Sequence, residues 1–331
     1  MAVAARREAP LPAAPEPPEA FDEAWALLNG AAVETPPAGW TGADQELADR
    51  LVPQVLAHFS RNHPAPTSFP ALALQIIELL EDPEVDLNRV LRAISPDPAI
   101  SLHILKVANS ALYGRGAVVQ DMRLAVMRIG VRGVGEIAAG VAGRSLYDVG
   151  LKVEYQVFQD RWHRLFLDTM AVAFGASQFA FEQQVGRPDR VFQAGMFHDI
   201  GKSLALRSLA ALTISGQVPP DLPSRVVDDV LERVHVEVGC VLHQVCGLPA
   251  HLAGLCRDHH LPDIPDDPEH MDLHLLRTVS GIHRLVLDPQ DTRHLDETRH
   301  SLRAMRLVRR GAKLLYRELT GQTARVAVLF P

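Results

Sequence analysis

The chain has 331 residues, with 40 acidic side chains against 33 lysines and arginines, which gives a formal net charge of −7. This balance excludes a general electrostatic attraction for nucleic acid or anionic membranes, so any such binding would need a local patch. A hydrophobic fraction of 47% is typical of a globular protein, and the length allows two modest lobes. Because no apolar run approaches the roughly 18 residues of a membrane span, we expect no transmembrane segment.

The cysteines and the N-terminal residues both bear on cellular location. Cys240, Cys246 and Cys256 lack the CxxC spacing of zinc and redox motifs, so reduced buried thiols are the simplest interpretation. The first 20 residues contain no apolar core of signal-peptide length. We therefore expect a cytoplasmic protein that binds no membrane.

Residues 1–41 are predicted to form a disordered or loosely structured tail. Their first half is rich in alanine and proline and cannot build a core, although FDEAWALLNG at 21–30 is typical of a short helix. Regular helical spacing of apolar residues begins near residue 42, where we place the start of the main domain.

Residues 42 to about 150 are interpreted as an N-terminal helical lobe. The segments QELADRLVPQVLAHFSRNH, FPALALQIIELLED and DLNRVLRAIS repeat apolar residues at helical spacing, and Asp86 is placed to cap the third. PDPAISLHILKVANSALYG restarts with Asp97 as cap and Pro98 at the first helical position. Strand-like alternation is confined to RVAVLF near the end of the chain. The predicted fold class is therefore all-α.

A second helical lobe is predicted at about 151–265, followed by a C-terminal helical extension at 266–331. The lobe contains QVFQDRWHRLFLDTMAVAFGASQFAFEQ, RVFQAGMFHDIG, PSRVVDDVLERVHVEVGCVLHQVCG and LPAHLAGLCRDHH. In the extension, PDIPDDPEHMD and LDPQDTRHLDE bracket one helix, and a last long helix covers about 296–319.

The stretch AGMFHDIGKSLAL carries the strongest chemical signal. His198 and Asp199 end an apolar run and place an imidazole and a carboxylate at one spot, which suits a divalent cation. The alternative is a buried hydrogen bond that fixes a helix end. Lys202 supplies a positive charge to that carboxylate, or to the phosphate of a substrate.

Two ligands do not complete a metal site, and further histidines occur in the same lobe. They are His163, His235, His243, His251, His259 and His260, and a metal site would have to be completed from among them. Adjacent side chains on a helix diverge by about 100°, so we expect only one of His259 and His260 to face a shared centre.

FHDIGK resembles the signature of the HD superfamily, the metal-dependent phosphohydrolases of all-α fold. More narrowly, residues 66–262 resemble the HDOD domain, the HD-related output domain of bacterial signalling proteins. The resemblance is carried, in order, by FPALALQIIELLEDPEVDLNRVLRAISPDPAISLHILKVANSALYG, MRLAVMRIGVRGV, AGMFHDIGK and HVEVGCVLHQVCGLPAHLAGLCRDHH. The resemblance implies a two-lobed helical fold and a regulatory role, since most HDOD domains are non-catalytic.

Carried over residue by residue, the resemblance implies an incomplete metal site. His198 and Asp199 match the HD dyad, and His235 with one of His259 and His260 matches ligands of the related HD-GYP phosphodiesterases. Arg164 stands where a first-helix histidine is expected, and LRTVSGIHRLV has no carboxylate where an aspartate is expected. A guanidinium beside a cation site opposes metal binding.

We therefore expect no cofactor and a non-catalytic regulatory protein that acts in signal transduction through an HDOD interaction module. The alternative is a phosphohydrolase that acts on a cyclic nucleotide or another phosphate ester. It would use Fe, Mn or Zn, with His198, Asp199 and Lys202 as its catalytic residues. The input signal and the oligomeric state remain open.

The last predicted helix carries six basic residues spaced four, three, four, three and four apart, which predicts a stripe on one face. They are Arg299, Arg303, Arg306, Arg310, Lys313 and Arg317. Such a stripe is usually a solvated face. The alternative is the docking of an anionic signalling partner at Arg303, Arg306, Arg310 and Lys313. Without interleaved aromatic residues, the stripe disfavours nucleic acid as that partner.

Overall fold

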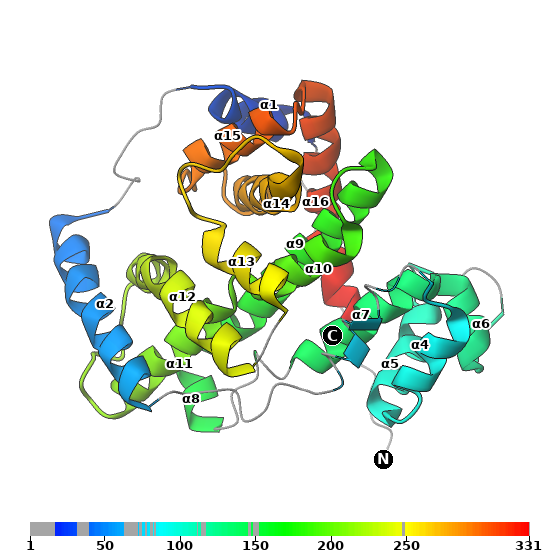
Figure 1. Ribbon diagram of the computed structural model, residues 1–331. Coiled ribbons are helices and arrows are strands. Elements are labelled where there is room, and N and C mark those ends of the chain that lie inside the picture. Colours follow the sequence, from blue (N-terminus) through cyan, green and yellow to red (C-terminus); the bar gives the residue numbers. More distant parts are fainter. Residues whose placement is uncertain are drawn as a thin grey trace, which may run out of the picture.

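The computed structural model describes residues 17–31, 40–62, 84–110, 117–144, 152–246 and 249–330, with single positions at 72, 75, 76, 78, 79, 82, 112, 113 and 147. Every regular element in these residues is a helix, so the fold is all-α as predicted. Figure 1 shows the helices from α4 to α7 gathered at one end of the molecule. No helix in the described part of the chain combines the length and the apolar character that crossing a bilayer requires.

The N-terminal lobe is built from short helices, several of which begin at aspartate caps. They are α4 (Leu87–Ile94), α5 (Pro98–Ala108), α6 (Met122–Ile129) and α7 (Val131–Gly143). The carboxylates of Asp86 and Asp97 accept backbone N–H groups at the starts of α4 and α5, which confirms both predicted caps. The predicted helix FPALALQIIELLED lies largely outside the described residues.

The HD-like lobe packs around a long central helix, α9. Its helices are α8 (Lys152–Val157), α9 (Gln159–Gln183), α10 (Pro188–Phe197), α11 (Ile200–Ile214), α12 (Ser224–Cys246) and α13 (Ala250–Asp258). α9 packs against α10, and α11 packs against α12. Both pairs contribute buried side chains to one continuous core.

Two helices near the N-terminus have positions that the sequence pattern did not indicate. α2 (Gly42–Asn62), grouped above with the N-terminal lobe, packs against α11 and α12 of the HD-like lobe. α1 (Pro17–Leu28) lies in the segment expected to be loosely structured, yet its Phe21 and Leu28 are buried. Phe21, Ala24 and Leu28 share one helical face, and that face packs on the C-terminal helices. Residues 1–16 and 32–39 of the predicted tail lie outside the described residues.

The predicted long helix over 296–319 is wrong, because the chain breaks there. The C-terminal extension contains α14 (Met271–Leu287), α15 (Leu295–Ala304) and α16 (Arg309–Leu329). Arg306, just after α15, has a left-handed φ of 52°, and the N–H of Leu307 donates to the carbonyl of Leu302 at 2.9 Å. This is a helix-terminating geometry that usually carries glycine. Since an arginine occupies the position, no local residue pattern signals the break.

The end of α16 connects the two lobes. RVAVLF, the one strand-like run of the sequence, belongs to α16 up to Leu329. The next residue, Phe330, is fully buried. Its ring centroid lies 5.5 Å from that of His103 in α5 and 5.4 Å from that of Phe166 in α9. The extension is therefore an integral part of the fold.

Candidate functional site

The His198–Asp199 pair lies at the junction between two helices. His198 follows the last residue of α10, and Asp199 precedes the first residue of α11. Two residues later, Gly201 lets α11 approach α12 so closely that a Cβ at this position would overlap the carbonyl oxygen of His235. This contact brings His235, itself fully buried, next to Asp199.

Three buried imidazoles point their Nε2 atoms toward Asp199. The Nδ1 atoms of His198, His235 and His259 each bond a backbone carbonyl three residues earlier, at 2.9, 2.8 and 2.6 Å. A carbonyl only accepts, so Nδ1 carries the proton and Nε2 keeps its lone pair. His235 Nε2 lies 3.3 Å from Asp199 Oδ1 and 3.1 Å from His259 Nε2.

Asp199 Oδ1 and the Nε2 atoms of His235 and His259 are hydrogen-bond acceptors that face one another with no hydrogen atom to share. Asp199 Oδ1 is buried and has no hydrogen-bond partner among the described residues. Burial lowers the pKa of His235 to about 3 and lowers the pKa values of His198 and His259, so all three rings are neutral. Asp199 Oδ1 and the Nε2 atoms of His235 and His259 therefore fit one divalent cation.

The other carboxylate oxygen of Asp199 is occupied by a cation of the protein itself. The Lys202 ammonium lies 2.7 Å from Asp199 Oδ2 and 2.9 Å from Glu232 Oε2. Arg284 of α14 reaches Glu232 with both terminal nitrogens, at 2.8 and 3.1 Å. Burial opposes their ionisation, but the neighbouring cations hold the pKa values of Glu232 and Asp199 well below their ordinary range. Lys202 and Arg284 therefore occupy carboxylate oxygens that a metal ion at Asp199 Oδ2 and Glu232 would need as ligands.

A second layer of imidazoles and carboxylates lies behind Glu232. His294 Nε2 donates to Glu232 at 2.9 Å, while His260 Nδ1 and His294 Nδ1 bond the two oxygens of Glu297 at 2.8 and 3.0 Å. The rings of His260 and His294 stack with their centroids 3.7 Å apart. This layer connects α12, the end of α13 and the start of α15.

His259 and His260 do not diverge as adjacent helical residues were expected to. One ligand nitrogen from each lies within 4.8 Å of that of His235. The reason is their position just beyond the last residue of α13, where regular helical geometry ends. Both predicted candidates therefore lie near the site, with His259 the closer to Asp199.

A model of the HDOD domain matches residues 67–262, which is more than half of the chain. The chain belongs to the HDOD family. The match coincides within one residue with the span identified from the sequence, and it contains the dyad, His235, His259 and His260. All of α1, α2, α14, α15 and α16 lies outside it.

Relatives of this HDOD protein agree in fold. An HDOD domain protein of unknown function from Geobacter sulfurreducens has a TM-score of 0.59 at 20% identity, covering 85% of this chain and 99% of its own. A Shewanella amazonensis protein named as a metal-dependent phosphohydrolase has a TM-score of 0.56 at 20% identity, covering 86% and 100%. A Marinobacter aquaeolei protein named as a signal transduction protein has a TM-score of 0.55 at 17% identity, covering 94% and 66%. At such identities the likeness shows the fold alone.

A curated relative gives the length comparison. An uncharacterized protein of Treponema pallidum is 28% identical over 208 residues, which make up 60% of this chain. The match spans only 38% of the Treponema protein's length.

The two departures from the HD pattern both face the same cavity. Arg164 of α9 and Ser280 of α14 line a cavity of about 300 Å³ together with His198, Asp199 and Lys202. Ser280 Oγ lies 3.5 Å from His198 Nε2, so a hydroxyl faces His198 from the α14 segment in which an aspartate was expected. Besides Asp199, five carboxylates line this cavity, and none of them was a candidate from the sequence: Asp168, Asp228, Glu232, Asp288 and Asp291.

The pairing of Lys202 with Asp199 was expected from the sequence, but its second partner, Glu232, was not. Glu232 precedes His235 by three residues on α12, so its place on the same helical face could have been inferred from spacing. Arg284, His294 and Glu297 carried no such signal, because their proximity depends on how α14 and α15 pack.

The predicted basic stripe is divided by the break between α15 and α16. Arg306, Arg310 and Lys313 line one groove together with Arg317, whereas Arg303 lies outside it. Arg299 bonds the backbone carbonyls of Leu27 and Ala31 and so fastens α15 to the end of α1. The six cations therefore do not form one continuous surface.

Proposed function

We propose that this HDOD protein is a non-catalytic regulator that acts in the cytoplasm, in bacterial signal transduction, by binding a protein partner. The observation that carries the proposal is the position of Lys202, whose ammonium lies between Asp199 and Glu232. A positive side chain, rather than a metal ion, neutralises these two carboxylates.

Charge and geometry both oppose a two-metal centre at this place. Two-metal hydrolysis of a phosphate ester needs two cation positions about 3.5–4 Å apart, with ligands for each. Asp199 Oδ2 is committed to Lys202, and Arg284 adds a second positive charge against Glu232. Arg164 lines the same cavity, where α14 faces His198 with Ser280 and not with a carboxylate. Two other carboxylates there, Asp228 and Asp291, are paired with Arg161 and Arg293. Like charges therefore disfavour a second metal ion.

A metal-dependent phosphohydrolase is the second candidate, and the acceptor cluster favours it. Asp199 Oδ1, His235 and His259 would hold one ion such as Fe, Mn or Zn, and a bound metal polarises a phosphoryl oxygen. In such an enzyme, Lys202 could bind the substrate phosphate only by giving up its ion pairs with Asp199 and Glu232. The names of the solved relatives divide between the two functions and do not decide.

Metal analysis combined with a hydrolysis assay separates the two functions. The protein is purified without chelators, its metal content is measured, and turnover of cyclic dinucleotides and a chromogenic phosphodiester is followed with Fe, Mn or Zn added. We expect well under one equivalent of metal and no turnover. Turnover that Asp199→Asn abolishes would overturn the proposal. Bound metal without turnover would correct only the expectation that there is no cofactor.

A further inference from the structure

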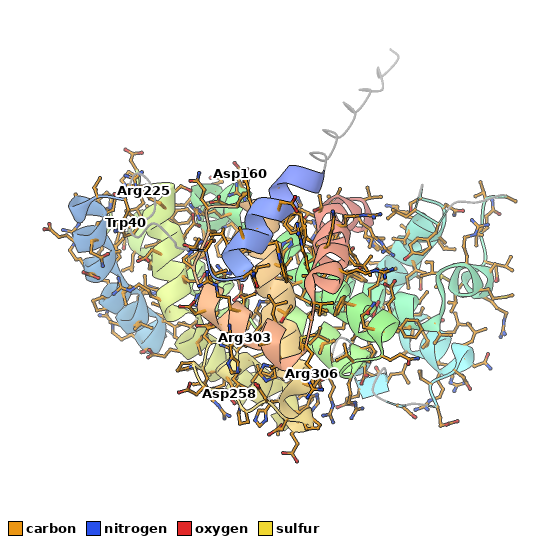
Figure 2. All side chains as sticks on the ribbon, turned by 90° about the horizontal axis from the view of Figure 1, so that it is seen from above. Trp40, Asp160, Arg225, Asp258, Arg303 and Arg306 are labelled. Carbon is orange, nitrogen blue, oxygen red and sulfur yellow. The ribbon has the colours of Figure 1, made fainter. Side chains whose placement is uncertain are left out.

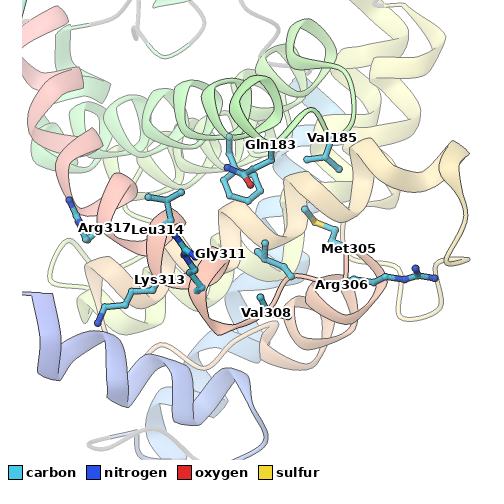
Figure 3. Close-up of a pocket in the computed structure, with 12 residues that line it drawn as sticks. Gln183, Val185, Met305, Arg306, Val308, Gly311, Lys313, Leu314 and Arg317 are labelled. Atoms are coloured by element: carbon cyan, nitrogen blue, oxygen red, sulfur yellow. The ribbon is translucent and has the colours of Figure 1, made fainter.

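A groove between the end of α9 and the α15–α16 junction combines an apolar floor with a basic rim. Its volume is about 880 Å³. Phe179, Val185, Met305 and Leu307 contribute apolar surface, and Figure 3 shows Arg317 and Lys313 on one side of the apolar side chains and Arg306 on the other. Most of its lining residues follow residue 304, so the groove lies along the C-terminal extension.

The charges of the groove are unbalanced. Four exposed cations line it, and none of the lining residues is acidic. Among the described residues, Arg306, Arg310 and Arg317 form no ion pair, whereas Arg309, directly beside them, pairs with Asp22 of α1. In a chain whose net charge is −7, this local excess of positive charge attracts a complementary negative surface.

The apolar part of the groove is open to a partner. Val308 is 69% exposed and Leu314 is 44% exposed, although both are aliphatic and border the cations. Isolated exposed aliphatic residues are common, but here they border a floor in which Val185, Met305 and Leu307 are also only partly buried. A partner that covered them would gain apolar burial in addition to charge neutralisation.

Arg306 is held in a backbone conformation that favours glycine. It follows α15 with a φ of 52°, where glycine would avoid the steric cost of a Cβ. The guanidinium of Arg306, which Figure 2 labels, lines the groove despite this cost. A binding role gives the arginine a function that helix termination alone would not require.

The cations on α16 have the spacing of a helical partner. Arg310, Lys313 and Arg317 stand three and four residues apart, so they span about 10 Å along the helix axis. Carboxylates three and four residues apart on another helix have the same repeat. Together with the apolar floor, this spacing matches an amphipathic helix with acidic flanks.

We propose that the groove binds an acidic amphipathic helix of a signalling partner. The inference rests on the proposed function in one respect, the identification of the bound helix as part of a signalling partner. It does not depend on the dyad, because binding at the groove requires neither metal nor turnover. A catalytic result in the assay above would therefore overturn the proposed function and leave this inference standing.

The test uses the full chain and a labelled synthetic peptide designed as a helix with leucines on one face and glutamates beside them. Fluorescence anisotropy measures its affinity at low and raised salt, and a peptide with glutamine in place of each glutamate is the matched control. We expect binding of the acidic peptide, weakened by salt, and binding of the glutamine peptide on the order of tenfold weaker. Equal binding of the two peptides would overturn the proposal.

Three variants locate the binding surface. Arg310→Glu with Arg317→Glu should weaken the acidic peptide on the order of tenfold, whereas Arg303→Glu, outside the groove, should have little effect. Arg306→Gly should weaken binding without lowering the unfolding midpoint, because it relieves the left-handed backbone. If Arg303→Glu weakens binding as much as the double reversal, or if anionic vesicles or single-stranded DNA compete equally well, the groove is not the specific site proposed.

Discussion

The ammonium nitrogen of Lys202 lies 2.7 Å from Oδ2 of Asp199, one turn away at the start of α11. Both side chains are largely buried, with exposed fractions of 9% and 16%. Because Glu232 approaches the same ammonium from α12, one lysine neutralises carboxylates from two helices. Its removal leaves the buried Asp199 carboxylate without this cation, whereas Glu232 keeps Arg284.

Lys202→Met should therefore lower the free energy of unfolding by about 3–5 kcal/mol, the cost of breaking a buried ion pair from one side. Urea unfolding followed by circular dichroism measures the change. Arg233→Met is the matched control, because Arg233 forms an exposed pair with Asp49 and should cost less than about 1 kcal/mol. Equal effects of the two substitutions would show that Lys202 is not the central cation of the site.

The buried neutral imidazole of His235 predicts a loss of stability in mild acid. Burial lowers its pKa from an ordinary 6.5 to about 3, so between these values the unfolded chain binds a proton that the folded chain does not. Its contribution is complete above about pH 6.5 and declines as the pH falls toward 3. His235→Gln should flatten the decrease in unfolding free energy over this range. Parallel pH profiles for the variant and the natural chain would contradict the prediction.

Gly201→Ala should disrupt the contact between α11 and α12. The added Cβ would overlap the carbonyl oxygen of His235, and backbone cannot move aside as a flexible side chain can. We expect a loss of about 3 kcal/mol in unfolding free energy. Gly321→Ala, in α16 with nothing within 4 Å of its Cβ, should instead gain about 0.5–1 kcal/mol. Thermal unfolding of both variants provides the comparison.

Phe330→Ala should destabilise the protein and loosen the N-terminal lobe. The ring packs against His103 of α5 and Phe166 of α9, and its loss leaves a cavity worth about 3–5 kcal/mol. Phe181→Ala is the control, since Phe181 is 67% exposed. Hydrogen exchange should show faster exchange in α5 for Phe330→Ala only. Unchanged protection of α5 would indicate that Phe330 does not hold the lobes together.

Local sequence patterns predicted most helices, because caps such as Asp86 and Asp97 and the spacing of apolar residues act within a few residues. They did not predict the break at Arg306, where the left-handed position carries no glycine. The candidate site divides in the same way. His198, Asp199 and Lys202 form one short motif, whereas Arg284 meets Glu232 only through the packing of α14 against the HD-like lobe, which no local pattern encodes.

The packing of α2 against α11 and α12, and of α16 against α9, limits how modular the HDOD segment is. A fragment cut at the family match, residues 67–262, would lose both covering helices and expose the buried faces beneath them. Such a fragment should aggregate on expression. If the same segment is transplanted into another protein, that host must supply helices that cover these two faces. The segment that can be exchanged as a unit is therefore longer than the family match.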